Sequence, residues 1–302
     1  MNSFRQRIAF LALIAGATGI GFAPNFVRLS EVDPPATAFH RLLLAQPLLW
    51  LWVRLERRGA TIPRQPATRR ELGLLAAAGI FFAGDMALWN WSLRFTAVAN
   101  STLLTNFAPI FVTLGAWLLF REKITTHFLA GMALALGGAT MLVGTSLKIS
   151  PQHLLGDGLA LSTAVFYAGY LLCVSRLRRA FSTATIMAWS GVASCAGLGL
   201  ITWISGERTW PPTATGWLVL VALAVVSHIG GQSLIAYGFG HLPASFSSVS
   251  LLWQPFVAAV AAWVLLREPL GLLQAASGVV ILLGIATASG SLRASARVTA
   301  AG

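Results

Sequence analysis

The sequence has very few charged residues: they make up 10% of its 302 positions, whereas a soluble domain has about a quarter. The longest strongly polar interval covers only residues 54–71, so the sequence leaves no room for a separate soluble domain. Cysteine is also rare, since Cys173 and Cys195 are the only two and both lie in apolar stretches. The sequence therefore carries neither a disulfide framework nor a Cys/His cluster of the metal-binding type.

What is abundant is apolar sequence. Hydrophobic residues make up 56% of the chain and its mean hydropathy is +0.74, as expected for an integral membrane protein. A helix of about 20 residues crosses a bilayer core that is about 30 Å thick. Ten apolar stretches have such a length, which predicts an all-α membrane protein with ten transmembrane helices. The stretches are 8–29, 36–53, 72–93, 98–120, 125–146, 156–175, 184–205, 215–239, 243–266 and 270–289.

The positive charges predict the orientation of the chain, because Lys and Arg gather in the cytoplasmic loops of membrane proteins. With the N-terminus inside, 15 of the 21 basic residues fall in cytoplasmic segments and 5 outside, while Arg41 lies within the second stretch. We therefore expect both termini in the cytoplasm. This asymmetry, and not a nucleic-acid partner, accounts for the net charge of +12. Arg5 and Arg7 precede a stretch too long for a signal peptide, so we expect no cleavage.

Two helix-length stretches repeat one another. Residues 106–122 read NFAPIFVTLGAWLLFRE and residues 252–268 read LWQPFVAAVAAWVLLRE. The landmarks recur at a constant spacing of 146 positions, as in Pro109 and Pro255, Trp117 and Trp263, Arg121 and Arg267, Glu122 and Glu268, and Gly138 and Gly284. Each copy has five stretches, and because five is odd the second copy enters the membrane upside down. We predict two inverted five-helix repeats, over residues 1–149 and 150–290, and a short cytoplasmic tail over 291–302.

Inverted repeats around a site near the middle of the membrane are typical of secondary transporters. A duplication that only builds a helical scaffold is the alternative. A channel would favour rings of polar residues and a filter, which the sequence lacks. An enzyme is not expected, because the chain has no H-E-x-x-H, no G-x-S-x-G and no carboxylate dyad on paired stretches.

Polar side chains within the stretches are few, and such groups usually face a cavity or one another. Asp85 could hold a substrate ammonium, carry a proton, or form a structural ion pair with Arg41. His228 could carry a proton or be a hydrogen-bonded packing residue, and Glu122 and Glu268 are expected to cap helices or pair with arginines. The candidate substrate-binding residues are Asn25, Asp85, Trp89, Asn90, Asn106, Tyr167, Tyr170, His228, Gln232, Trp253 and Gln254.

The depth of these residues predicts one central cavity. Its expected lining is Trp253, Gln254, Asn106, Tyr170, Gln232 and Trp89. Apolar walls with a few polar groups suit an amphipathic or aromatic solute, and the single deep cation, Arg41, argues against anionic sugars. Pro109 and Pro255 remove a backbone hydrogen bond within their stretches and are candidate hinges beside the site. Small residues recur every four positions at Gly131 and Ala135, which indicates close helix packing.

Four motifs resemble the EamA type of the drug/metabolite transporter superfamily, and the match covers nearly the whole chain. They are FAPNF at 22–26, PPATAFHRLLLA at 34–45, APIFVTLGAWLLFREK at 108–123 and GDGLALSTAVFYAGYLLCVSR at 156–176. Ala23, where the family usually has glycine, and Lys123 and Pro269, which follow the two glutamates, depart from the pattern. The length and the many aromatic residues look most like the YddG-type aromatic amino acid exporters of bacteria.

The resemblance implies an exporter of small amphipathic metabolites, with amino acids as the first expectation. The alternatives are an exporter of another metabolite or drug class, or a facilitative, channel-like uniporter. The expected partners are an amino acid-like solute and the lipid bilayer, without metal or cofactor, and a monomer is one option for the assembly. Because arginine supplies 19 of the 21 basic residues, we expect the inner membrane of a bacterium.

Overall fold

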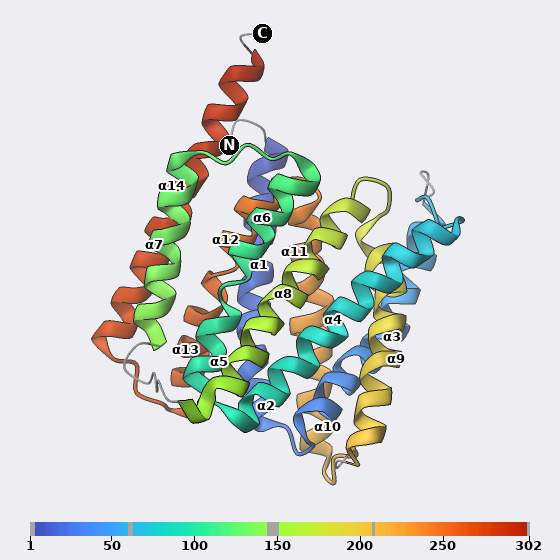
Figure 1. The fold of residues 1–302 in the computed structure, drawn as a ribbon. Helices are drawn as coiled ribbons and strands as arrows, with labels where there is room; N and C mark the ends of the chain where they lie inside the picture. The colour runs from blue at the N-terminus through green and yellow to red at the C-terminus, as the bar shows by residue number, and fades with distance from the viewer. Residues whose placement is uncertain (1–3, 60–62, 144–150, 207–208, 301–302) are drawn as a thin grey trace.

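The computed structural model describes residues 4–59, 63–143, 151–206 and 209–300, and these residues form helices and no strands (Figure 1). The first half of the chain contains seven α-helices. They are α1 (Phe4–Gly21), α2 (Ala23–Leu29), α3 (Pro34–Glu56), α4 (Arg69–Phe95), α5 (Val98–Thr105), α6 (Ala108–Phe120) and α7 (Thr126–Val143). The second half begins with the 3-10 turn η2 (Pro151–His153) and includes the π-helical segment η3 (Leu223–Gln232). Its α-helices are α8 (Leu154–Leu177), α9 (Thr183–Ser205), α10 (Ala214–Ala222), α11 (Ser233–Phe239), α12 (Ala244–Ser250), α13 (Trp253–Leu266) and α14 (Leu272–Ala300).

Nine helical segments of the described chain are long and apolar enough to cross a membrane, one fewer than the ten that the sequence predicts. The predicted stretch that is missing from the nine is 36–53, which corresponds to α3. This helix has 23 residues, and its polar content, with His40, Arg41 and Gln46, sets it apart from the other nine. The prediction of an all-helical protein with several membrane spans is thus confirmed. The tenth predicted span, α3, is not apolar enough to be recognised as one.

Three of the long helical segments are interrupted, each shortly before a proline. The first breaks at Phe22, between α1 and α2, the second at residues 106–107, between α5 and α6, and the third at residues 251–252, between α12 and α13. Pro24, Pro109 and Pro255 follow these breaks by two or three residues. Because proline has no N–H and its ring clashes with the preceding turn, a helix is easily interrupted there. The second and third breaks lie at equivalent positions of the two copies.

Helices α7 and α14 lie side by side along one flank of the molecule (Figure 1). Their backbones touch through glycine: a Cβ on Gly138 would lie 2.9 Å from the backbone nitrogen of Ile281, and one on Gly284 only 2.4 Å from that of Ala135. Residues further along α7 contact residues earlier in α14, so the two helices run antiparallel. The contacts are also reciprocal, because Ile281 and Gly284 are the residues 146 positions after Ala135 and Gly138.

The two repeated glutamates both hold helix ends together, as expected from the sequence. The carboxylate of Glu122 accepts hydrogen bonds at the start of α12 from the Ala244 amide at 2.7 Å, the Ser245 amide at 3.1 Å and the Ser245 hydroxyl at 2.5 Å. Glu268 instead accepts a hydrogen bond from the Arg28 guanidinium, at the end of α2. Each glutamate therefore joins the first copy to the second.

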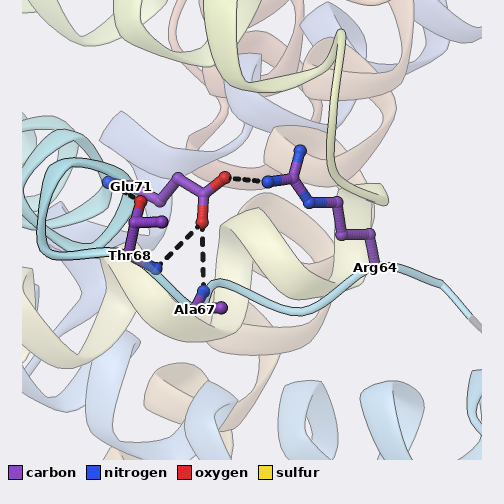
Figure 2. A network of polar contacts seen from close by, with 4 residues as sticks. All are labelled: Arg64, Ala67, Thr68 and Glu71. Atoms are coloured by element: carbon purple, nitrogen blue, oxygen red, sulfur yellow. Dashed lines mark hydrogen bonds and ion pairs between the residues drawn. The ribbon is translucent and has the colours of Figure 1, made fainter.

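The start of α4 carries a capping box (Figure 2). The Thr68 hydroxyl accepts a hydrogen bond from the Glu71 amide at 3.2 Å, and the Glu71 carboxylate accepts hydrogen bonds from the amides of Ala67 and Thr68 at 3.0 and 3.1 Å. Arg64 adds an ion pair to Glu71. These contacts satisfy amide groups that a helix start leaves unpaired and fix the connection from α3 to α4 at this end.

Candidate functional site

A small cavity of about 60 Å³ lies between the two equivalent helix breaks. One side comes from the break between α5 and α6, the opposite side from the break between α12 and α13, and α8 closes the gap. The lining residues are Thr105, Asn106, Ala108, Pro109, Tyr167, Leu171, Ser248, Leu251, Leu252 and Gln254. The cavity thus brings together three of the predicted binding residues, Asn106, Tyr167 and Gln254, beside the predicted hinge Pro109.

The cavity is small for a binding site. A space of this size holds a few water molecules, whereas pockets for small-molecule ligands measure about 300–1,000 Å³. An organic metabolite would therefore have to widen the cavity in order to enter.

A cluster of buried aromatic and charged side chains adjoins the cavity through Tyr167. The Tyr167 and Tyr170 rings stack with their centroids 6.3 Å apart, and Phe82 packs on Tyr170 at 4.8 Å and on His228 at 5.8 Å. The Arg41 guanidinium lies 6.0 Å from the centre of the Phe82 ring. The cluster joins α3, α4, α8 and η3, so any movement of these helices changes it.

Arg41 and Asp85 belong to this cluster as opposite charges. Their exposed fractions are 5% and 4%, and the two lie within electrostatic reach of each other. The direct ion pairs found among the described residues lie elsewhere, so Arg41 and Asp85 attract one another without direct contact. Both side chains can therefore still form a direct ion pair. A ligand with one positive and one negative group could bind Asp85 and Arg41 together.

Several buried polar groups at the cavity and in the cluster are left unpaired. The Tyr170 hydroxyl donates to the Met187 sulfur at 3.8 Å. The Nε2 atoms of Gln232 and Gln254, Nδ2 of Asn106 and both ring nitrogens of His228 are buried without a hydrogen-bond partner. A buried polar group left unpaired costs about 1–3 kcal/mol. These atoms are thus the strongest candidates for binding a polar ligand.

The π-helical segment η3 positions His228 and Gln232. It packs tightly on α1, because the Ser227 hydroxyl donates to the Gly19 carbonyl at 2.9 Å and a Cβ on Gly231 would lie 2.9 Å from the Ile20 amide nitrogen. π-Helical turns occur frequently at functional sites. The sequence predicts an uninterrupted helix over 215–239, so this widened segment is a feature that sequence reasoning missed.

Asn25 and Trp253 lie outside the lining of the cavity. The Asn25 side chain donates to the Ala258 carbonyl at 3.0 Å, and the Trp253 indole donates to the Thr18 hydroxyl at 3.2 Å. Both contacts tie the first helical segment to α13. In this conformation the two residues join the copies together, next to the cavity.

Trp89 and Asn90 also lie apart from the cavity, on α4. The Asn90 side chain donates to the Met86 carbonyl of its own helix at 2.9 Å, and Trp89 is half-buried. Ser248, by contrast, lines the cavity although sequence reasoning passed over it. The signal that could have revealed it is the run SFSSVS at 245–250, four serines at the start of an apolar stretch.

Comparisons with known proteins agree with this architecture. An uncharacterized transporter of Archaeoglobus fulgidus is 25% identical over 290 residues, which cover 94% of this chain and 97% of the relative. A probable terminal-alkyne amino-acid exporter of Streptantibioticus cattleyicolor is 28% identical over 278 residues, or 90% of this chain and 86% of the relative. A pseudopaline exporter of Pseudomonas aeruginosa is 25% identical over 276 residues, or 90% and 92%.

One crystal structure matches with a TM-score of 0.77 at 18% identity, covering 96% of this chain and 98% of the other, and so has the same fold. The model of the EamA-like transporter family matches twice, at residues 7–144 and 154–290. The two matches fall on the two copies that the spacing of 146 residues reveals. The chain belongs to the EamA-like transporter family.

Proposed function

We propose that this protein is a secondary transporter that exports small amphipathic metabolites, with amino acids as the substrate class, by alternating access around the central cavity. The observation that carries the proposal is the meeting of two equivalent helix breaks at one cavity. Broken helices at a repeat interface are where secondary transporters bind their substrates. Pro109 and Pro255, beside the breaks, are the hinges of this proposal.

Reciprocal contacts support the inverted arrangement of the two copies. The α7–α14 pair is one example, and a second involves the first helix of each copy. In the second copy, α8 is the equivalent of α1, and η3 with α11 is the equivalent of α4. Helix α1 packs on η3 and α11, and α8 packs on α4. A pseudo-two-fold axis in the membrane plane produces such pairs of contacts. The cavity lies where the equivalent breaks approach each other, so exchanging the conformations of the copies would open it to either face.

The burial of α3 supports a tenth span. Its polar residues His40 and Arg41 are buried, at 2% and 5% exposure, whereas Leu48, Leu51 and Leu55 are about half exposed, at 47%, 49% and 55%. A helix that turns leucines outward and hides its charges suits a lipid environment. With ten spans, both termini lie on one side, and the charge bias makes that side the cytoplasm of a bacterial cell.

The chemistry of the site supports an amino acid-like substrate. Arg41 and Asp85 offer one cation and one anion, and Tyr167, Tyr170 and Phe82 offer aromatic surface. A zwitterion with an apolar side chain matches both features. Two relatives also carry the names of metabolite exporters, namely a probable terminal-alkyne amino-acid exporter and a pseudopaline exporter.

Counterflow in proteoliposomes tests the proposal. Purified protein is reconstituted with an excess of one unlabelled amino acid inside, and uptake of the labelled amino acid is followed for a panel that includes tryptophan, phenylalanine and alanine. We expect transient accumulation of the labelled substrate, since an alternating-access carrier exchanges solutes. Flux without any accumulation would identify a channel-like uniporter, and no flux for the whole panel would reject amino acids as the substrate class.

The cavity itself is tested with Gln254→Ala and Asn106→Ala. Each removes a buried donor, and a lost hydrogen bond of about 1.5 kcal/mol corresponds to roughly ten-fold weaker binding. Gln274→Ala is the matched control, because this glutamine accepts a hydrogen bond from the Gly271 amide far along the chain from the breaks. Equal effects of all three substitutions on half-saturation would remove the cavity from the binding site.

A further inference from the structure

A second hollow, unrelated to the central cavity, opens at the corner between α6 and α7. This open hollow has a volume of about 440 Å³. Its lining residues are Trp117, Leu118, Arg121, Glu122, Lys123 and Ile124. The corner combines the end of an apolar helix with two cations.

Two cations, Arg121 and Lys123, line this corner against one carboxylate, Glu122. Both oxygens of the neighbouring Glu122 are occupied by the start of α12, and the ion pairs found among the described residues involve neither Arg121 nor Lys123, which are both exposed. Nearby, the Arg179 guanidinium lies 5.1 Å from the centre of the Phe120 ring and adds a third exposed cation. The corner is therefore a positively charged recess.

The wall beneath the charges is apolar and faces outward. Trp117 and Leu118 are 54% and 60% exposed. Tryptophan at the end of a membrane helix lies at the level of the lipid headgroups. A molecule that fills the recess would thus place an anionic group at the cations and an apolar chain along the helix.

We propose that this recess is a binding site for one anionic phospholipid, with its phosphate between Arg121 and Lys123 and its acyl chains along Trp117 and Leu118. Clusters of cations beside a membrane helix attract anionic lipid headgroups, and the volume of the recess suits a headgroup. The assignment to the cytoplasmic leaflet rests on the orientation proposed above. The binding itself does not depend on that orientation.

The second copy provides an internal comparison. Its equivalent corner keeps Arg267 but has Pro269 where the first copy has Lys123, and its glutamate, Glu268, is bound to Arg28. That corner has one cation fewer of its own, and the cation it receives from the first copy, Arg28, is paired with Glu268. We therefore expect lipid selectivity at the first corner and not at the second.

The test compares variants that spare the backbone. Arg121 has a φ of 56° and Arg267 a φ of 57°, a left-handed conformation that glycine adopts without strain. Arg121→Gly with Lys123→Gln therefore removes both cations without distorting the turn, and Arg267→Gly is the matched control. Native mass spectrometry of the full-length protein in a neutral detergent measures binding of phosphatidylglycerol, phosphatidylcholine and inorganic phosphate.

We expect the wild type to bind phosphatidylglycerol in preference to phosphatidylcholine. The double variant should bind phosphatidylglycerol about 30-fold more weakly, about five-fold for each cation, while Arg267→Gly keeps the wild-type affinity. Equal binding of the two lipids, equal loss in the control, or displacement of the lipid by inorganic phosphate would overturn the proposal. The measurement does not depend on substrate transport. A negative transport assay therefore does not affect the lipid-binding result, and a negative lipid-binding result does not affect the transport proposal.

Discussion

Arg28 and Glu268 form an ion pair with a nitrogen–oxygen distance of 2.6 Å that joins the end of α2 to the turn after α13. The equivalent glutamate of the first copy, Glu122, is bound to the start of α12. Each glutamate thus joins one copy to the other at one end of the molecule. In the inverted arrangement these ends lie at opposite membrane faces, so alternating access would have to release the two contacts in turn.

Weakening the Arg28–Glu268 pair should favour the state that is open to the outside. Both side chains are about half exposed, at 55% and 45%, so the pair is worth at most about 1 kcal/mol, or a five-fold change in population. We expect Glu268→Gln to speed labelling of a cysteine at Ser248, in the cavity, by an impermeant thiol reagent added outside. Arg267→Gln, which leaves the pair intact, is the control, in a background without Cys173 and Cys195. Equal rates in both variants would contradict a role in closure.

The same pair gives a pH dependence with a definite sign. The hydrogen bond from Arg28 lowers the pKa of Glu268 below its ordinary value of 4.5. A carboxyl with a lowered pKa stabilises the paired state above its ordinary pKa, and this contribution is lost as the pH falls through the lowered value. The ratio of the labelling rates of Glu268→Gln and its parent, taken at each pH so that the ionisation of the thiol cancels, should therefore stay constant from about pH 8 to about pH 5 and approach one only below about pH 4.5. A change of this ratio near neutral pH would point to another group.

Impermeant thiol labelling can also establish the orientation of the chain. Arg58 and Arg179 are exposed positions at the connections between long helices, and Thr215 is exposed in the first turn of α10. Single cysteines there should not disturb packing. With both termini inside, Arg58→Cys and Arg179→Cys should react only when the reagent reaches the cytoplasm, and Thr215→Cys only from outside. Labelling of Arg58→Cys and Thr215→Cys from one face would contradict the ten-span arrangement.

The sequence predicts those features that depend on short-range chemistry or on counting. The helical stretches follow from apolar length, and the tasks of Glu122 and Glu268 follow from their positions beside helix ends. The depth of Trp253, counted along an unbroken helix, predicts a place in the cavity wall. In the structure Trp253 comes directly after the break at 251–252 and donates its indole N–H to Thr18, while Gln254 lines the cavity.

The π-helical widening of η3 could not be predicted from the sequence, for a related reason. A π-helical turn arises from packing against a neighbour, here α1 across Gly19 and Gly231, and leaves no periodic pattern in the residues themselves. The charge interaction of Arg41 with Asp85 could be anticipated from their similar depth. That the two charges stay out of direct contact is a tertiary property, which their depth along the helices does not predict.

Asp85→Asn tests the role of the buried charges. Arg41 is 5% exposed, and removing the nearby carboxylate leaves its buried charge uncompensated. Because the two charges are not in direct contact, the cost should fall below the roughly 3–5 kcal/mol of a direct buried ion pair. We expect a fall in the yield of folded protein in the membrane, and recovery of that yield in the double variant Asp85→Asn with Arg41→Gln. Uphill transport should remain lost in the double variant if the charges bind the substrate. A normal yield with uphill transport lost and exchange retained would instead identify Asp85 as a proton carrier.

The contact between α7 and α14 predicts a specific pattern of glycine substitutions. A Cβ on Gly131 would lie 2.3 Å from the Ala288 backbone nitrogen, whereas a Cβ on Gly137 would meet nothing within 4 Å. Gly131→Val should therefore destabilise the protein by about 1–3 kcal/mol or more, since backbone atoms cannot move aside as side chains do. Gly137→Val, on the same helix and with the same change in helix propensity, is the control. Thermal unfolding of the purified protein in detergent measures both.

The reciprocal geometry extends this prediction to the second copy. Gly138 faces Ile281, and Gly284 faces Ala135, at 2.9 and 2.4 Å from a Cβ to a backbone nitrogen. If the two copies pack about a pseudo-two-fold axis, Gly138→Ala and Gly284→Ala introduce equivalent clashes into the α7–α14 interface, one from each helix. Both should then lower the unfolding temperature, with the larger fall for Gly284→Ala because its contact is shorter. When the two are combined, their effects should fall short of additivity, because the separation of the helices that relieves one clash also relieves the other. Strictly additive losses would mean that the two contacts relax independently and that the helices do not move apart as rigid bodies.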